Sequence, residues 1–207
     1  MSGNHRVLLF GGTFDPIHHG HLIVAQAAAA ELGIDRVVLV AAGQPPHRPE
    51  DRLAPAEDRL RMAQLAVAGD GLFAVSDCEL ERPGPSYTLD TVRYFRGVYG
   101  PGVELYWLIG GDNLAELAGW HQVRQLVEEC TVVAAARPGH GEGDLAGLAG
   151  VLEAPALERL RRHLLRTPQV DISAREIRRR AAGGQSIRYL VPEAVREHIE
   201  RRGLYRC

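Results

Sequence analysis

The stretch GGTFDPIHHGH, residues Gly11 to His21, contains two adjacent glycines, an Asp-Pro pair and three histidines within eleven residues. It follows the apolar run RVLLF (Arg6–Phe10) and leads into the alanine-rich segment His21–Gly33. The apolar run is typical of a buried strand, and an alanine-rich segment that ends in glycine is typical of a helix. The stretch is therefore expected to be the loop of a strand–loop–helix unit.

This loop is expected to meet a ligand, because ligands of open α/β sheets bind outside the carboxyl ends of the strands. Gly11 and Gly12 let the backbone approach a bulky anion, and the first amides of the following helix attract phosphate. His18 and His21 are three residues apart, so they share one face if the helix begins near His18. The residues alone leave a phosphate site, a metal site and a plain tight turn open. The GxGxxG and GxxxxGK[ST] patterns are absent.

Strand-like and helix-like segments alternate along the chain. Strands are predicted at 6–10, 36–42, 72–76, 103–110 and 130–136, and helices at 21–33, 54–69, 86–100 and 123–129. This alternation predicts an α/β fold, a Rossmann-like, doubly wound and mostly parallel sheet with helices on both faces. The glycine-rich segment 137–150 is expected to be a flexible surface loop.

The C-terminal part differs in character, with a strand end followed by a basic helix capped by Ser173 over 170–184, and a last helix over 191–205. We therefore predict a single domain over residues 1–207. Its Rossmann-like core is expected over 1–170 and a small C-terminal helical subdomain over 171–207.

Composition excludes several classes of protein. The 24 basic and 26 acidic residues give a formal net charge of -2, which argues against a nucleic-acid binder. Cys78, Cys130 and Cys207 are far apart and odd in number, which favours a reducing compartment over a disulfide framework or zinc site. No signal peptide or long apolar run is evident, so a cytoplasmic protein without a membrane partner is expected.

The opening stretch resembles the GxFDPxHxGH signature of the HxGH nucleotidyltransferase superfamily. Further motifs follow in a fixed order, namely QPPHR (44–48), PSYTLDT (85–91), LIGGDN (108–113), GWHQV (119–123) and ISAREIR (172–178). Together they make the chain similar to bacterial nicotinate-nucleotide adenylyltransferases, from Val7 to Tyr205. This resemblance favours the phosphate site among the three possibilities.

The resemblance implies that ATP and nicotinate mononucleotide are converted to nicotinate adenine dinucleotide and pyrophosphate, a step of NAD biosynthesis. The mononucleotide phosphate attacks the α-phosphorus of ATP. A phosphate monoester has a second pKa of about 6, so it is largely ionised at neutral pH and needs no catalytic base. Mg²⁺ is expected to arrive with ATP, held mainly by phosphates and water, because no carboxylate cluster offers a site.

The resemblance also assigns residues to the two substrates. His18 and His21 match the HxGH histidines that contact ATP phosphates, and Arg178 lies in a second phosphate motif. The expected ATP-binding residues are Gly11, Gly12, Phe14, Asp112 and Ser173, and the expected acceptor-binding residues are His47, Arg48, Ser86, Tyr87, Thr88 and Trp120.

Three positions depart from the family pattern. Arg48 stands where relatives usually have lysine, which keeps the charge but changes its geometry. Ala174 and Arg175 replace a serine and a threonine, so one hydroxyl contact is lost. Simpler interpretations remain for some residues, including a solvated basic face for Arg178 and a core position for Trp120.

Other functions are alternatives to this one. A sister adenylyltransferase could act on nicotinamide mononucleotide or phosphopantetheine, although the phosphopantetheine enzyme would not be expected to carry PSYT and GWHQV. A module that binds a nucleotide without turning it over need not keep His18, His21, Ser173 and Arg178. A structural metal protein would need a carboxylate or cysteine beside the histidines.

Overall fold

The computed structural model describes residues 5–45, 53–135 and 142–206. The chain forms two compact units. The first comprises Met1–Gly11, Val24–Val38 and Tyr87–Gln169, and the second comprises Gly12–Ile23, Leu39–Ser86 and Val170–Cys207. The predicted division at residue 170 stays a prediction. Among the described residues, none of the helices has the length and apolar character needed to cross a membrane.

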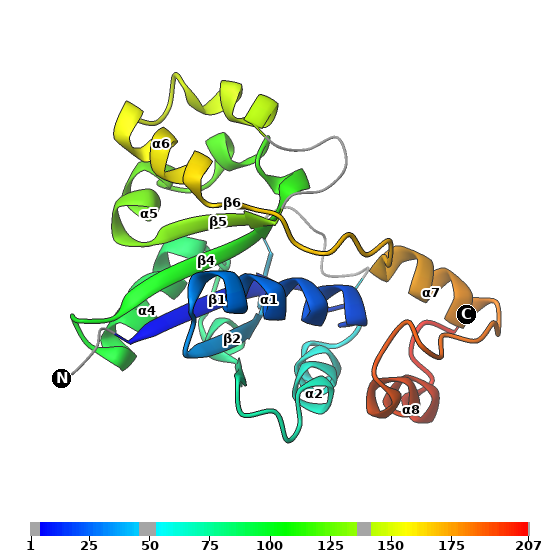
Figure 1. Cartoon of the computed structure of the whole chain (residues 1–207). Helices are drawn as coiled ribbons and strands as arrows, with labels where there is room; N and C mark the ends of the chain where they lie inside the picture. The colour runs from blue at the N-terminus through cyan, green and yellow to red at the C-terminus, as the bar shows by residue number, and fades with distance from the viewer. Residues whose placement is uncertain (1–4, 46–52, 136–141, 207) are drawn as a thin grey trace. The chain divides into compact units, whose positions relative to one another are not determined.

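Six strands form one sheet in the order β3-β2-β1-β4-β5-β6 (Figure 1). The strands are β1 (Arg6–Gly12), β2 (Arg36–Ala41), β3 (Phe73–Ser76), β4 (Glu104–Gly110), β5 (Thr131–Ala135) and β6 (Leu164–Leu165). Strand β4 runs parallel to both β1 and β5, and β5 runs parallel to β6. The predicted doubly wound α/β fold is confirmed. Because the chain moves outward from β1 to β3 and then returns to β4, the order reverses beside β1, at a switch point.

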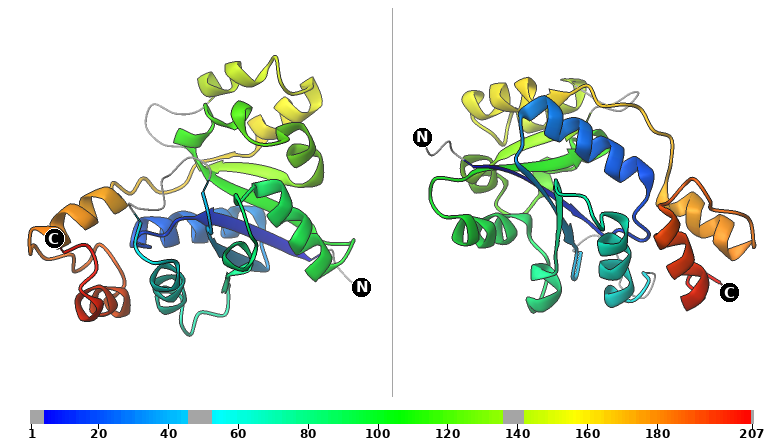
Figure 2. Two further views of the ribbon diagram at one scale, coloured as in Figure 1. Left: turned by 180° about the vertical axis from the view of Figure 1, so that it is seen from behind. Right: turned by 60° about the horizontal axis from the view of Figure 1, so that its bottom comes forward.

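The first unit contains the centre of this sheet. Residues 7–9 of β1 are fully buried, as an apolar run between two helical layers should be. Helices α1 and α4 lie on opposite faces of the strands (Figures 1 and 2). The helices of this unit are α1 (His19–Leu32, whose first turn belongs to the second unit), α4 (Thr88–Tyr99), α5 (Val123–Glu129) and α6 (Ala154–Arg162).

One segment of the first unit differs from the prediction. Residues 142–148, expected to be part of a flexible loop, form the 3-10 helix η4 (Glu142–Leu148). Leu145 and Leu148 are 3% and 1% exposed. Burial of these two apolar side chains stabilises the segment, whereas its glycines have no side chain to bury. Helix α6 and strand β6 were also absent from the prediction.

The second unit packs helix α2 (Ala56–Ala66) beside α8 (Glu193–Arg202), as both figures of the ribbon show (Figures 1 and 2). It also contains α3 (Cys78–Glu81) and α7 (Ala174–Ala182). The buried carboxylate of Asp58 joins α2 to α8. It accepts hydrogen bonds from His198 Nε2 at 2.9 Å and from Arg202 Nε at 3.0 Å. Burial alone would raise the pKa of Asp58, but hydrogen bonds from Arg202 and His198 outweigh it and lower that pKa.

Replacing Asp58 with alanine is expected to lower the free energy of unfolding by about 3 kcal/mol, because His198 and Arg202 lose a buried partner. The expected fall in Tm is roughly 6–12 °C. Since the folded-state pKa of Asp58 is lowered, its contribution is present above the ordinary carboxylate pKa and is lost as pH falls through the folded value. Thermal unfolding of the variant and the wild type at neutral and acid pH measures this difference in stability. Glu57→Ala, an exposed neighbour on the same helix, is the control. If the Tm of Asp58→Ala at neutral pH fell no further than that of Glu57→Ala, the prediction would be contradicted.

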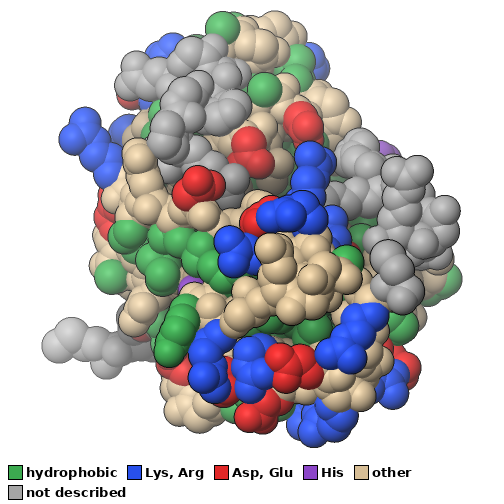
Figure 3. All heavy atoms as spheres, turned by 90° about the vertical axis from the view of Figure 1, so that its right-hand side faces the viewer, with side chains coloured by type: hydrophobic (Ala, Val, Ile, Leu, Met, Phe, Trp, Pro, Cys, Tyr) green, Lys and Arg blue, Asp and Glu red, His purple; other side chains and the backbone are tan. Residues whose placement is uncertain are grey.

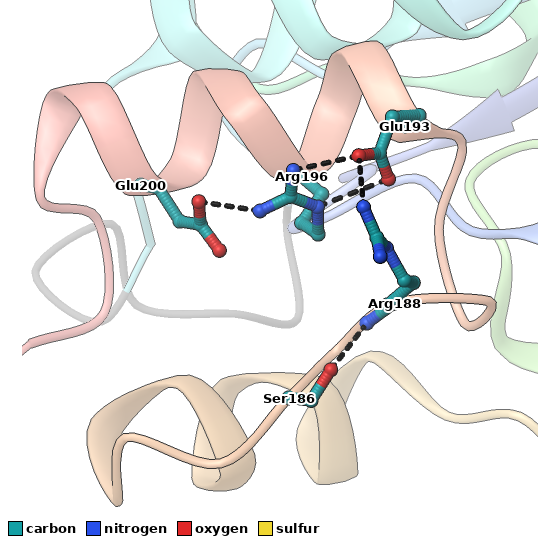
Figure 4. A network of polar contacts seen from close by, with 5 residues as sticks. All are labelled: Ser186, Arg188, Glu193, Arg196 and Glu200. Atoms are coloured by element: carbon teal, nitrogen blue, oxygen red, sulfur yellow. Dashed lines mark hydrogen bonds and ion pairs between the residues drawn. The ribbon is translucent and has the colours of Figure 1, made fainter.

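An ion-pair network fixes the turn between α7 and α8 (Figure 4). The Glu193 carboxylate accepts hydrogen bonds from Arg196 and from Arg188, which hold its pKa down at about 2. Arg196 also pairs with Glu200. On the face that carries these two helices, basic and acidic side chains are interspersed (Figure 3). Within this turn, the charges of Arg188 and Arg196 are therefore balanced by the carboxylates of Glu193 and Glu200.

Candidate active site

The two signature histidines lie face to face in the second unit. Helix α1 begins at His19, and the carbonyl of His18 accepts hydrogen bonds from the amides of His21 and Leu22, at 3.0 and 3.4 Å. The His18 and His21 rings stack with their centroids 3.7 Å apart and their planes 21° apart. The predicted common face is confirmed. The amide of His19 donates to the carbonyl of Leu190, which ties this helix start to the α7–α8 turn.

The backbone selects one tautomer of His21. The amide of His18 donates to Nδ1 of His21 at 3.2 Å. Because an amide can only donate, Nδ1 must be the unprotonated nitrogen, and the proton of the neutral ring lies on Nε2. The loop therefore turns the His21 ring into a donor at Nε2, which suits a ring that meets phosphate oxygens.

Two glycines of the signature lie close against neighbouring rings. A Cβ on Gly20 would lie 3.0 Å from Nδ1 of His18, and a Cβ on Gly12 would lie 2.9 Å from the Phe14 ring. Phe14 is 1% exposed, and its ring meets His21 edge-on at 5.4 Å. Phe14 thus packs against the His21 ring. The predicted nucleotide contacts of Gly12 and Phe14 stay predictions.

Gly11 belongs to the first unit, where a Cβ would come within 2.6 Å of the buried Trp107 ring. This gives Gly11 a packing reason that the sequence did not indicate, since the prediction was close approach to an anion. Its role in ATP binding stays a prediction.

Helix α7 presents Arg178 toward the signature loop. Ser173 accepts a hydrogen bond from the amide of Glu176 at 3.2 Å, which confirms the predicted cap. Arg178 Nη1 donates to the carbonyl of Asp15 at 2.6 Å and lies 3.5 Å from its carboxylate. Its neighbours differ, because Arg179 and Arg180 both pair with Glu176. Arg178 is therefore distinguished by geometry from the basic residues that follow it.

Two buried contacts that hold the signature loop were not predicted from the sequence. The buried Arg59 of α2 donates to the carbonyl of Thr13 at 3.0 Å and to that of Ala42 at 2.7 Å. The buried carboxylate of Asp15 accepts a hydrogen bond from the hydroxyl of Tyr205 at 2.8 Å. Asp15 lay within the quoted signature, but nothing in the sequence marked Arg59 as buried.

The first unit carries a second group of predicted residues. Asp112 is exposed and lies in the 3-10 helix η2 (Gly111–Asn113), directly after β4. Trp120 follows the 3-10 helix η3 (Leu117–Gly119) and is partly exposed, so it is not a core tryptophan. Tyr87 stacks on His121 with centroids 4.1 Å apart, and His121 was not among the predicted residues.

The start of α4 is partly as predicted. The helix begins at Thr88 with Tyr87 as its cap residue, and the Tyr87 side chain makes no capping hydrogen bond. Ser86, which lies in the second unit, was expected to open this helix. Its hydroxyl oxygen instead accepts hydrogen bonds from the amides of Gly43 and Gln44, at 3.2 and 3.1 Å. His47 and Arg48 lie outside the described residues.

Three histidines so close in the sequence are also compatible with a metal site. Within residues 5–45, 53–135 and 142–206, no group of three His, Cys, Asp or Glu side chains is placed to hold a metal ion. The paired imidazoles and the nearby basic side chain of Arg178 have the chemistry of an anion site.

The chain is similar to known proteins of one family. The cytidylyltransferase-like family matches residues 9–180. A protein of Thermus thermophilus named "Probable nicotinate-nucleotide adenylyltransferase" is 47% identical over 97% of this chain and 100% of its own length. A relative of the same name from Moorella thermoacetica is 45% identical over 97% of this chain and 92% of its own. The chain belongs to the nicotinate-nucleotide adenylyltransferase family.

Solved structures agree with this membership at the level of the fold. The nicotinic acid mononucleotide adenylyltransferase of Plasmodium falciparum, complexed with NaAD, aligns with a TM-score of 0.75 over 97% of each chain, at 18% identity. The same protein complexed with APC gives a TM-score of 0.74. In this member of the nicotinate-nucleotide adenylyltransferase family, the matched range 9–180 begins within β1 and ends two residues beyond Arg178.

Proposed function

We propose that the chain transfers the adenylyl group of ATP to the phosphate of nicotinate mononucleotide, forming nicotinate adenine dinucleotide and pyrophosphate. Identity of 40–47% to adenylyltransferases of that name, over 95% or more of the chain, carries this conclusion. The stacked His18 and His21 rings at the start of α1 give it a chemical basis.

The reaction is an in-line displacement at phosphorus. A phosphate oxygen of the mononucleotide forms a bond to the α-phosphorus of ATP, and the bond from that phosphorus to the bridging oxygen of the β-phosphate breaks. Pyrophosphate takes the electron pair and leaves. The attacking phosphate is largely dianionic at neutral pH. The protein's contribution is therefore to place two polyanions and to stabilise the charge that develops.

We assign the charge stabilisation to His18, His21 and Arg178. His21 would donate from Nε2 to a phosphate oxygen, in the tautomer that the His18 amide selects. Arg178 would add a fixed positive charge whose position is set by Asp15. Preorganised donors of this kind act where negative charge develops and need no reorganisation during the reaction. Gly11, Gly12, Phe14, Asp112 and Ser173 complete the proposed ATP site.

Magnesium enters as part of the substrate. Mg²⁺ prefers oxygen ligands and keeps several waters, and a triphosphate supplies such oxygens itself. We therefore propose that Mg²⁺ comes to the protein with ATP. We place the reaction in the cytoplasm, where the free, buried thiols of Cys78 and Cys130 fit a reducing compartment.

We assign acceptor recognition to His47, Arg48, Ser86, Tyr87, Thr88 and Trp120. The start of α4 supports this for the nicotinate carboxylate, because the first amides of a helix have no partner within the helix and attract an anion. The partly exposed Trp120 offers a ring face for the pyridine. The hydroxyl of Ser86 is turned toward Gly43 and Gln44, so its part would be to hold the chain before α4.

The acceptor assignment predicts a preference for nicotinate over nicotinamide mononucleotide. The carboxylate gains charge-assisted hydrogen bonds that a neutral amide cannot match, about 1.5–3 kcal/mol, so kcat/KM should differ at least about tenfold. The measurement is the ratio of kcat/KM for the two mononucleotides with the same Mg-ATP. A ratio near one, or one that favours the amide, would assign the chain to the nicotinamide-specific sister activity.

A further inference from the structure

The Asp15 carboxylate joins three segments of the second unit that lie far apart in the sequence. Its side chain is fully buried. Oδ1 accepts hydrogen bonds from the Tyr205 hydroxyl at 2.8 Å and from the Ala54 amide at 3.2 Å. Oδ2 lies 3.5 Å from Arg178 Nη1, which also donates to the Asp15 carbonyl at 2.6 Å. A buried carboxylate is tolerated only when such partners satisfy it, so each donor constrains where it can lie.

Tyr205 is a constant donor in this cluster. Burial, the charge of Asp15 and the hydrogen bond to it all raise the pKa of Tyr205 far above its usual value, so the hydroxyl keeps its proton at any working pH. The ring reaches Asp15 because the chain reverses after α8. Gly203 and Tyr205 both adopt positive φ, at 64° and 65°. A left-handed tyrosine persists only where surrounding contacts hold it.

Asp15 connects this C-terminal tyrosine to the proposed ATP site. It lies three residues before His18 and follows Phe14, whose positive φ of 47° shows a tightly turned backbone. Movement of the Asp15 carboxylate would release Arg178 from its position. Tyr205 itself need touch no substrate to have this effect.

Resting on the adenylyl transfer proposed above, we propose that Tyr205 is a positioning residue for ATP. Its hydroxyl holds Asp15, and Asp15 in turn fixes the carbonyl and carboxylate that orient Arg178. The C-terminal end of the chain thereby contributes to nucleotide binding, beyond the range 9–180 that the cytidylyltransferase-like family matches.

Tyr205→Phe tests this by removing one oxygen. We expect kcat/KM for ATP to fall about tenfold, because the lost hydrogen bond involves a charged partner. The KM for nicotinate mononucleotide should stay within about twofold, since Arg178, which Asp15 orients, is assigned to ATP. Tyr189→Phe is a matched control, because Tyr189 also has a positive φ, at 68°, but is 83% exposed and should leave all constants unchanged.

A double-mutant cycle identifies the route. In an Arg178→Ala background, Tyr205→Phe should cost less than about twofold, because its target is already gone. Equal costs in both backgrounds would overturn the proposal, as would a Tyr205→Phe variant that loses only Tm and keeps its kcat/KM. Titration of each protein with Mg-ATP alone gives an affinity that requires no acceptor. If the wild type makes no dinucleotide, the proposed function fails, while this titration still decides the role of Tyr205.

Discussion

His21→Ala is expected to lower kcat by at least about a hundredfold, and His18→Ala by a similar factor, because each removes a preorganised group that meets the developing charge. The two rings are stacked and share one hydrogen-bonded turn, so each variant also disturbs the other ring. The KM for nicotinate mononucleotide should change far less than kcat, since the histidines are assigned to ATP. Steady-state kinetics with both substrates varied separates the two constants.

His19→Ala is the matched control. It removes the imidazole of the residue that stands between His18 and His21 in the sequence. The contact that His19 makes with Leu190 uses its backbone amide, which alanine retains. We expect kcat within a few-fold of the wild type. If His18→Ala and His21→Ala also stay within a few-fold, the histidines are not the catalytic groups.

Arg178→Ala is expected to raise the KM for ATP and to lower kcat, each by about tenfold or more, because a charge-assisted contact to phosphate is lost. Arg180→Ala should have little effect, since Arg180 pairs with Glu176 at the surface and exposed pairs contribute about 0–1 kcal/mol. The two arginines lie on the same helix, so the comparison controls for net charge. Equal effects at both positions would indicate a diffuse basic surface in place of a defined contact.

The sequence predicted the fold well wherever local pattern and packing agree. The runs of β1, β2, β4 and β5 are apolar because helices cover both faces of the sheet, and each was assigned as a strand. The segment around η4 was misjudged, because its glycines suggested a loop while Leu145 and Leu148 are buried by tertiary contacts. A single sequence does not display such long-range burial.

Features of the candidate site that lie within one contiguous motif were predicted from the sequence. Contacts between residues far apart in the sequence were not predicted. The pairing of His18 with His21 follows from helical spacing, and the Ser173 cap follows from its position before a helix. The bond from Tyr205 to Asp15 spans 190 positions, and no periodicity predicts it. Likewise, the close approach of the His18 ring to Gly20 is not visible in the sequence.

The most direct measurement of the central claim is pyrophosphate release from Mg-ATP with each of three acceptors, namely nicotinate mononucleotide, nicotinamide mononucleotide and phosphopantetheine. The product of each reaction is identified by its mass. Adenylyl transfer to nicotinate mononucleotide predicts pyrophosphate and nicotinate adenine dinucleotide in equal amounts, fastest with that acceptor. Release that is absent with nicotinate mononucleotide, or faster with either other acceptor, would contradict the account.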